Sequence, residues 1–440
     1  MNWESLLSLK RYGDTNKRLR AEQDDLRLGF EVDYDRIVFS NAFRSLQDKT
    51  QVIPFSKTDF VHTRLTHSLE VSVVGRSIGR LAGKAILEKY PYLQRVLGYQ
   101  PNDFGAITAA ASLAHDIGNP PFGHSGEKAI GHFFSSGKGV QYKEKLTATE
   151  FQDLCDFEGN ANGLKILTDS FPGTEGGLRL SYATLGAFVK YPKPSLPIKP
   201  SSHVADKKYG YFQAQAPFFK SLAEELGLVS AAGTFFRHPL AYLVEAADDI
   251  CYTIIDFEDG INLGWISEDY ALEYLINLVR DRIDSKKYAQ LAYKPQRLSY
   301  LRALAINSLI QDAVRVFIDH EDAIFKGTFE VALLDKSRYK AQIEDIINLS
   351  IRNIYQSKEV IQKEVIGHRA ISILLEHYSQ AAVQKWKGNA QTFDKLILSL
   401  VPEGTPIVGK TLYETLLNVS CFVASLSDGK ALRMAQDMGS

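Results

Sequence analysis

Apolar residues recur three and four positions apart along most of this chain, so helices dominate any fold that it can adopt. One stripe of this kind runs through Thr63–Tyr90, and His67 lies on it. A second expected helix starts near Asp103 as its N-cap and carries His115 at the end of its apolar face. A third runs through Pro239–Gly260 and places Asp248 among its apolar positions. We therefore expect three buried helices with polar, chemically capable side chains on their inner faces.

Strand signals are scarce in the rest of the sequence. Strict alternation of apolar and polar residues is confined to short pieces such as Tyr209–Phe212, which leaves room for one short β-hairpin. The expected class is mainly α. Four prolines with serines and lysines predict a long loop at about 192–210. We expect a core in residues 1–265 and further helices in residues 266–440 that pack on it.

Charge and cysteine content argue against several classes of protein and leave nucleic-acid binding open but unsupported. The chain has 51 Lys and Arg against 52 Asp and Glu, a net charge of -1, so it has no overall attraction to polyanions such as single-stranded DNA. Any phosphate-binding surface must be local. The three cysteines, Cys155, Cys251 and Cys421, lack paired spacing and predict neither a disulfide framework nor a thiolate metal site. Residues 1–10 do not resemble a signal peptide, and no apolar run is long enough for a membrane span, so we expect a cytoplasmic protein without a membrane partner.

The three expected helices deliver four side chains that can bind a metal: His67, the adjacent pair His115 and Asp116, and Asp248. A single histidine on an apolar face is more often a hydrogen-bonded core residue than a ligand. A buried carboxylate, however, is costly unless it is paired or metal-bound, and here two carboxylates accompany two imidazoles. Mixed nitrogen and oxygen donors suit Mg²⁺, Mn²⁺ or Fe²⁺ at least as well as Zn²⁺. The set predicts a divalent-metal site.

A second histidine follows the pair His115 and Asp116 on a glycine-flanked turn. His124 lies between Gly123 and Gly126, and Glu127 is three residues further on. Histidine exchanges protons near neutral pH, and a neighbouring carboxylate can orient it and tune its charge. We expect His124 to act in proton transfer with Glu127 as its partner.

The pattern of His67, His115, Asp116 and Asp248 resembles the HD superfamily of metal-dependent phosphohydrolases. More narrowly, the chain is similar to the deoxyguanosine triphosphate triphosphohydrolase family. The segments that carry this resemblance lie between about residues 10 and 260 and occur in the family's order: Asp33–Ile37, Asp48–Val52, Thr63–Ser68, His115–Glu127, Phe157–Ala161, Tyr182–Pro192 and Glu245–Asp256.

The resemblance implies an HD-domain helical core that binds one divalent ion, Mg²⁺ or Mn²⁺, through His67, His115, Asp116 and Asp248, with Asp248 preferred to Asp249. It implies that a dNTP is split between the α-phosphorus and the 5′ oxygen into deoxynucleoside and tripolyphosphate. The leaving group would then be an alkoxide, which departs badly at neutral pH unless an acid protonates it. His124 resembles that acid.

Substrate contacts are carried over in the same way. Arg64 resembles the family's triphosphate-binding arginine, and Lys190 and Lys208 are weaker candidates for the same role. Tyr252 and Asp256 follow Asp248 at intervals of four, so all three share one helix face, where the family places a phosphate-contacting Tyr and a sugar-contacting Asp. Gln51 and Asp256 resemble the family's contacts to the 3′-hydroxyl. The residues that read the base are expected in the second half of the chain, and dGTP and dNTPs in general stay open as substrates.

Two other functions remain as alternatives. Another HD phosphohydrolase, acting on cyclic dinucleotides, alarmone or monophosphates, would share the metal ligands but not the face of Asp248, Tyr252 and Asp256 with Gln51. A nucleotide- or single-stranded DNA-binding regulator would hold a structural metal and would have no need of the proton donor His124. The family resemblance also implies a homo-oligomer, often a hexamer, with an allosteric dNTP in some members.

Overall fold

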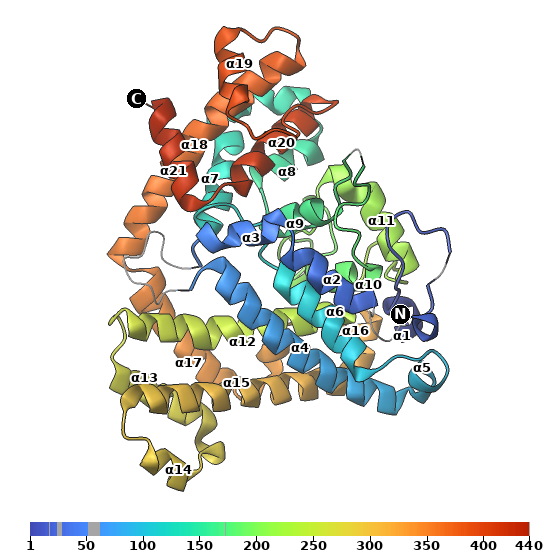
Figure 1. Cartoon of the computed structure of the whole chain (residues 1–440), viewed down its shortest axis with the longest axis vertical. Coiled ribbons are helices and arrows are strands. Elements are labelled where there is room, and N and C mark those ends of the chain that lie inside the picture. Colours follow the sequence, from blue (N-terminus) through green and yellow to red (C-terminus); the bar gives the residue numbers. More distant parts are fainter. Residues whose placement is uncertain (17, 24–28, 52–61, 172, 440) are drawn as a thin grey trace.

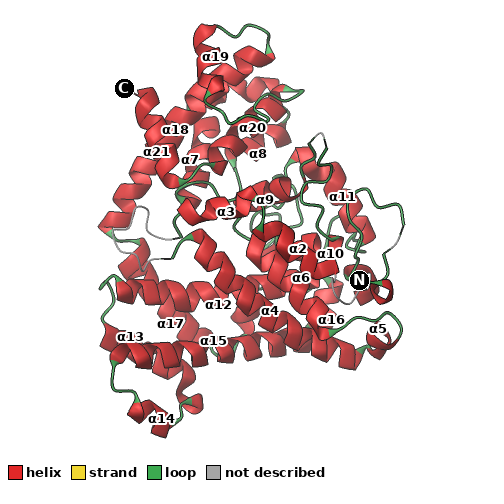
Figure 2. Cartoon of the chain, viewed as in Figure 1, coloured by secondary structure: helices red, strands yellow, loops and turns green. Residues whose placement is uncertain are grey.

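The computed structural model describes residues 1–16, 18–23, 29–51, 62–171 and 173–439, and these residues form helices joined by loops, without a strand (Figures 1 and 2). The α-helices up to residue 262 are α1 (Trp3–Leu6), α2 (Gly29–Val38), α3 (Asn41–Arg44), α4 (Arg64–Lys89), α5 (Pro91–Arg95), α6 (Pro101–Ala114), α7 (Gly123–Ser135), α8 (Ala148–Cys155), α9 (Gly159–Thr168), α10 (Tyr182–Phe188), α11 (Ala216–Glu225) and α12 (Pro239–Asn262). Those that follow are α13 (Glu268–Val279), α14 (Ser285–Gln290), α15 (Lys294–Asp319), α16 (Glu321–Lys326), α17 (Lys340–Ser350), α18 (Lys358–Trp386), α19 (Thr392–Ser399), α20 (Leu412–Ser425) and α21 (Asp428–Gly439).

Short turns of other helix types connect these elements. Most are 3₁₀ turns, and the last in the chain is a π turn: η1 (Arg20–Glu22), η2 (Ser45–Asp48), η3 (Lys138–Lys145), η4 (Val204–Asp206), η5 (Gln213–Gln215), η6 (Arg280–Arg282), η7 (Leu333–Lys336) and η8 (Ile351–Tyr355). The mainly α class is thereby confirmed. No helix among the described residues combines the length and the apolar character that crossing a bilayer requires.

The three helices expected from periodicity are present as α4, α6 and α12. Thr63 caps α4 through a hydrogen bond from the Thr66 amide, and α12 begins at Pro239. The prediction that Asp103 is the N-cap of α6 is wrong. The helix starts at Pro101, and the Asp103 carboxylate reaches back to accept a hydrogen bond of 2.8 Å from the Gln100 amide. An acidic residue in the first turn can cap from within the helix in this way.

Close packing of α4 on α6 positions the site. Gly75, Gly79 and Gly83 on α4 face α6, where a methyl group at Gly79 would lie 2.0 Å from Thr108 Oγ1 and one at Gly75 would lie 2.4 Å from Ser112 Oγ. Only glycine allows backbones to approach so closely. Higher numbers on α4 meet lower numbers on α6, so the helices are antiparallel. The first turn of α4 is therefore set beside the last turn of α6.

The buried apolar side chains form two cores. The larger one draws on α1, α2, α4, α6 and α10 to α13, and also on α15 and α17 from the second half of the chain. The smaller one joins α7 and α8 to α18, α20 and α21, in the upper part of Figure 1. Residues 266–354 thus pack into the larger core, and residues 370–435 build most of the smaller one. A domain boundary near residue 265 stays a prediction.

The expected β-hairpin does not form in the described residues, where only three isolated bridges occur. Tyr209–Phe212 runs without strand pairing between the two cores. Tyr211 packs into the larger core, whereas Tyr209 and Phe212 pack into the smaller one, so Tyr209 and Tyr211 do not share the single apolar face that a strand would give them. The neighbouring loop at 192–210 contains only the turn η4.

Candidate active site

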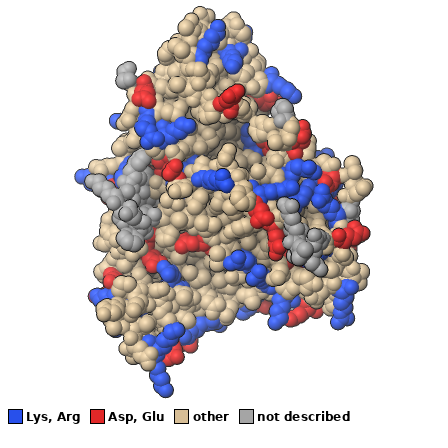
Figure 3. Space-filling model, in the orientation of Figure 1, with Lys and Arg blue, Asp and Glu red and all other residues tan. Residues whose placement is uncertain are grey.

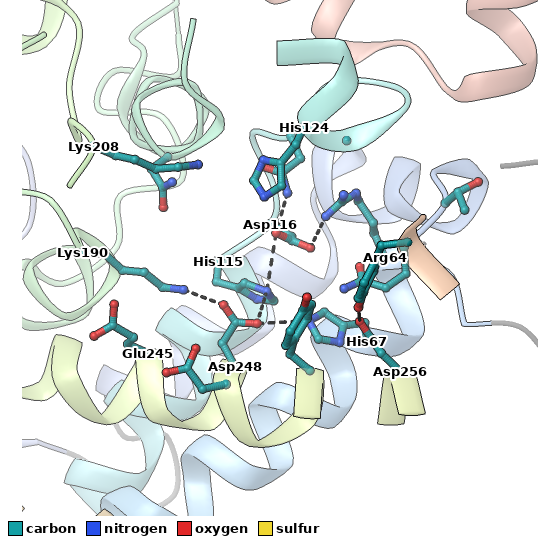
Figure 4. Close-up of a pocket in the computed structure, with 18 of the residues that line it drawn as sticks. Arg64, His67, His115, Asp116, His124, Lys190, Lys208, Glu245, Asp248 and Asp256 are labelled. Atoms are coloured by element: carbon teal, nitrogen blue, oxygen red, sulfur yellow. Dashed lines mark hydrogen bonds and ion pairs between the residues drawn. The ribbon is translucent and has the colours of Figure 1, made fainter. Parts of the chain in front are cut away.

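A cavity of about 530 Å³ opens where α4, α6 and α12 meet below α7. Figure 4 shows side chains from these helices and from the loop after α10 pointing into it. Eleven of the twelve site residues predicted from the sequence line this cavity: Gln51, Arg64, His67, His115, Asp116, His124, Lys190, Lys208, Asp248, Tyr252 and Asp256. The twelfth, Glu127, lies behind His124 and lines a neighbouring cavity.

Two buried imidazoles stand at the bottom of the cavity. His67 lies in the first turn of α4 and His115 caps the end of α6, with their ring centres 5.2 Å apart. His115 Nδ1 donates a hydrogen bond of 2.7 Å to the carbonyl of Ser112. Its Nε2 is therefore an unprotonated acceptor in the neutral ring, directed toward the two carboxylates.

The two carboxylates, Asp116 and Asp248, are arranged alike. In each, Oδ2 binds a cation: Asp116 is 2.5 Å from Arg64 Nη1, and Asp248 is 2.7 Å from Lys190 Nζ. In each, Oδ1 faces the imidazoles. Asp248 Oδ1 lies 3.2 Å from His67 Nε2 and 3.4 Å from His115 Nε2, and Asp116 Oδ1 lies 3.5 Å from His115 Nε2 (Figure 4).

These neighbours keep both carboxylates ionised. Burial alone would raise the pKa of each carboxyl, but Arg64 and the imidazoles hold the pKa of Asp116 well below its usual range. Lys190 and the imidazoles do the same for the pKa of Asp248. Both side chains therefore carry a negative charge at neutral pH and can donate oxygen lone pairs.

The cluster has the donor set of a divalent-metal site. Ligand atoms of His67, His115 and Asp116 lie within 4.8 Å of one another, and all three residues are buried. The Asp248 carboxylate contacts both imidazoles, as given above. Its neighbour Asp249 lines the same cavity, but burial and the nearby Glu245 raise the pKa of its carboxyl far above the usual value. Two imidazoles and two carboxylates fit Mg²⁺, Mn²⁺ or Fe²⁺.

His124 stands at the mouth of the cavity with its side chain 73% exposed. Phe122 and Gly123 precede it with φ of 61° and 56°, left-handed values that turn the chain sharply into α7. His124 Nδ1 lies 2.6 Å from Glu127 Oε2, and Glu127 Oε1 accepts a hydrogen bond of 2.8 Å from the Gly159 amide. The buried carboxylate thus fixes the imidazole by one nitrogen and leaves Nε2 for the cavity.

A second carboxylate and a lysine adjoin this pair. Lys208 Nζ lies 3.1 Å from Glu158 Oε1 and 3.9 Å from Glu127 Oε2. Burial and the charge of Glu127 raise the pKa of Glu158 to about 7. Burial also acts on Glu127, but His124 and Lys208 outweigh it and lower the pKa of Glu127. Glu127 therefore ionises at a lower pH than Glu158 does.

Gln51, Tyr252 and Asp256 occupy another part of the cavity wall, together with Tyr355 from the π turn η8. The Tyr355 hydroxyl donates a hydrogen bond of 2.6 Å to Asp256 Oδ2, and the rings of Tyr252 and Tyr355 stack at 5.6 Å. Asp256 Oδ1 and Gln51 Oε1 are buried acceptors without a hydrogen-bond partner among the described residues. Burial raises the pKa of Asp256 to about 7.

Sequence reasoning missed several residues of the cavity wall. Tyr355, Val360 and Glu364 come from the second half of the chain, where base-reading residues were expected, and Lys207 and Glu245 also line the cavity. A tyrosine at helical spacing looks like core, so no local signal distinguishes Tyr355. Glu245 had a usable signal, because it lies one turn before Asp248 on the apolar face of α12.

Comparison with known proteins identifies the family of this chain. The HD domain family matches residues 64–183, which include His67, His115 and Asp116. A Pseudomonas aeruginosa deoxyguanosinetriphosphate triphosphohydrolase-like protein is 37% identical over 446 residues, covering 100% of this chain and 98% of its own. A Synechocystis protein of the same name is 38% identical over 451 residues, covering 100% and 99%. The deoxyguanosinetriphosphate triphosphohydrolase of Klebsiella pneumoniae is 33% identical over 447 residues, covering 91% and 85%. The chain therefore belongs to the deoxyguanosinetriphosphate triphosphohydrolase family of HD-domain phosphohydrolases.

Proposed function

We propose that this protein is a metal-dependent dNTP triphosphohydrolase that converts dGTP, or dNTPs in general, and water into deoxynucleoside and tripolyphosphate. One observation carries the proposal. A single cavity combines a buried pair of imidazoles and ionised carboxylates with an exposed histidine held by a buried carboxylate. Its wall also carries two acceptors that have no hydrogen-bond partner in the described part of the chain. The imidazoles and carboxylates can hold a metal that activates water, the exposed histidine can protonate a departing sugar oxygen, and the acceptors can bind a sugar hydroxyl.

His67, His115, Asp116 and Asp248 would hold the divalent ion, for which Mg²⁺ and Mn²⁺ are the first candidates. When bound, such an ion polarises a phosphoryl oxygen and lowers the pKa of a bound water. The protein prepares the ligands for it: the Ser112 carbonyl fixes the tautomer of His115, and Arg64 and Lys190 keep the carboxylates ionised.

His124 would supply the proton that the departing 5′ oxygen needs. Its Nε2 faces the cavity while Nδ1 is held by Glu127, so a protonated His124 has its acidic N–H on the substrate side. Glu127, ionised and buried, stabilises the imidazolium and fixes its orientation. Lys208 supports Glu127 from the other side and is a candidate for contact with the phosphates.

Arg64, Lys190, Lys208 and Tyr252 would bind the triphosphate, whose negative charge a protein with a net charge of -1 must meet with local cations. Asp256 and Gln51 would read the 3′-hydroxyl, because each offers a buried acceptor that has no other partner among the described residues. The stacked rings of Tyr252 and Tyr355 close the wall beside Asp256 and would limit the space around the 2′ position.

The deciding experiment incubates the protein with each of the four dNTPs and with GTP in Mg²⁺ or Mn²⁺, followed by chromatography of nucleosides and inorganic products. We expect deoxynucleoside and tripolyphosphate in equal amounts and little reaction with GTP. Pyrophosphate or orthophosphate as first product would point to another HD phosphohydrolase. Tight nucleotide binding without turnover would favour a regulator.

The proposal also covers the domain organisation, the location and the assembly of the protein. Residues 1–265 would form the triphosphohydrolase core and residues 266–440 a helical region packed on it. By family resemblance the protein would be a cytoplasmic homo-oligomer, with a hexamer as the first candidate. A dNTP would be the candidate allosteric ligand. Single-stranded DNA has no specific support, since basic and acidic side chains are interspersed on the face shown in Figure 3.

A further inference from the structure

A buried carboxylate from the C-terminal end of the chain touches two separate parts of the proposed active site. Asp428, the first residue of α21, is 2% exposed. Its Oδ2 accepts a hydrogen bond of 3.1 Å from the amide of Thr50, and its Oδ1 accepts one of 2.9 Å from the amide of Phe122. One side chain therefore joins two backbone segments that are far apart in the sequence.

Both segments lead directly to a functional side chain. Thr50 precedes Gln51, the candidate contact to the sugar, and it also bridges to Thr63 at the start of α4. Phe122 precedes Gly123 and His124, at the left-handed turn that directs His124 to the cavity. The position of the Asp428 carboxylate thus bears on the sugar end of the cavity and on the proton donor together.

A buried lysine makes the parallel connection one residue away. Lys49 is 2% exposed, and its Nζ donates hydrogen bonds of 2.7 Å to the carbonyl of Asn119 and of 2.7 Å to the carbonyl of Ala424. Asn119 belongs to the turn between α6 and α7, and Ala424 to the end of α20. The chain around residues 424–428 therefore contacts segment 49–50 at two points and segment 119–122 at one, and Lys49 joins these two segments directly through Asn119.

We propose that Asp428 is a positioning residue of the enzyme, which fixes the Gln51 segment and the His124 turn relative to each other. The inference rests on the proposed function. A carboxylate suits this task because each of its oxygens accepts from one amide N–H, and both amides stay satisfied. An asparagine offers one oxygen only, so one of the two segments loses its anchor.

The test compares Asp428→Asn with Asp394→Asn as matched control. Asp394 is also buried and also accepts a backbone hydrogen bond, 2.8 Å from the Gln391 amide, but it lies at the start of α19, away from the cavity. Initial rates with dGTP and GTP, melting temperatures, and amide hydrogen exchange of peptides around Thr50 and Phe122 are measured for both variants.

We expect Asp428→Asn to lower kcat/KM for dGTP about 10- to 100-fold, because small displacements of catalytic groups have effects of this size. The preference for dGTP over GTP should fall as well, and exchange should rise at both amides. Asp394→Asn should leave kcat/KM for dGTP, the preference for dGTP over GTP and exchange at these two amides unchanged. This should hold even if it lowers the melting temperature as much as Asp428→Asn does. If Asp428→Asn does not fold, Asp428→Glu keeps the charge, displaces the carboxylate and should give the same pattern.

The inference is overturned if the folded Asp428 variant hydrolyses dGTP at the wild-type rate, with the wild-type preference over GTP and wild-type amide exchange. It is also overturned if Asp394→Asn loses rate and preference as much as the Asp428 variant does. A wrong assignment of function gives another result, because the wild-type protein itself would then release no tripolyphosphate from dGTP. In that case amide exchange alone decides whether Asp428 anchors both segments.

Discussion

Removal of the 3′-hydroxyl from the substrate tests the sugar end of the cavity most directly. Asp256 Oδ1 is buried and has no hydrogen-bond partner among the described residues, while Oδ2 already accepts from Tyr355. We expect the 3′-hydroxyl of dGTP to donate to Oδ1. The analogue 2′,3′-dideoxyguanosine triphosphate cannot, and it leaves this acceptor unsatisfied.

The size of the effect follows from the charge of the acceptor. The assay is run above the pKa of about 7, at about pH 8.5, where the Asp256 carboxyl is ionised. A hydrogen bond to a charged group is worth about 1.5–3 kcal/mol, which corresponds to about a 10- to 150-fold lower kcat/KM for the dideoxy analogue. In Asp256→Asn the acceptor is neutral, and the bond is worth about 0.5–1.5 kcal/mol, so discrimination should shrink to about 2- to 13-fold. The assay is chromatography of the released nucleosides at several concentrations of each substrate.

Asp153→Asn is a matched control for this substitution. Asp153 is also fully buried, its Oδ2 also accepts from a tyrosine, Tyr413, and its Oδ1 also lacks a partner among the described residues, but it does not line the cavity. This variant should discriminate between dGTP and the dideoxy analogue as strongly as the wild-type enzyme does. The reasoning is refuted if the wild-type enzyme hydrolyses both substrates within threefold of each other, or if Asp256→Asn discriminates as the wild type does.

Three further predictions follow from the site and its surroundings. His124→Ala should abolish turnover, while calorimetry should still detect nucleotide binding. His132 is exposed on the same helix, and the control His132→Ala should stay active. Near-normal rates in the His124 variant would show that His124 is not the acid. Asp248→Asn should lower the metal content in elemental analysis, whereas Asp249→Asn should keep it; equal losses would reassign the fourth ligand. Hydrogen bonds to Asp259 and Glu70 raise the pKa of His62 from 6.5 to about 10, so its stabilising effect is complete below pH 6.5 and lost as the pH rises through about 10. His62→Gln should therefore lower the melting temperature more at pH 6 than at pH 10, and a penalty independent of pH would contradict this assignment.

The sequence predicted the helices that carry the chemistry because their signals are local. Apolar spacing identified α4 and α12 with correct ends to within two residues, and it placed His67 and Asp248 on buried faces. It misplaced the cap of α6, since Asn, Asp, Ser and Thr serve both at the N-cap and inside the first turn. The aromatic residues at 209–212 suggested a strand because their spacing cannot distinguish one apolar face of a strand from residues that enter two separate cores.

By itself the sequence determined the class of fold, the family and eleven of the side chains that line the cavity, since residue type, periodicity and spacing are properties of short segments. The tertiary structure alone decided that Tyr355 hydrogen-bonds to Asp256 and that Arg64 and Lys190 each bind the Oδ2 atom of a carboxylate. It also decided that Ala424 and Asp428, from the far end of the chain, contact Lys49 and Thr50 beside the cavity. These contacts join residues between 52 and 378 positions apart. They depend on the register in which helices pack, and that register is set by the fit of many side chains together, which no periodic pattern in one segment records.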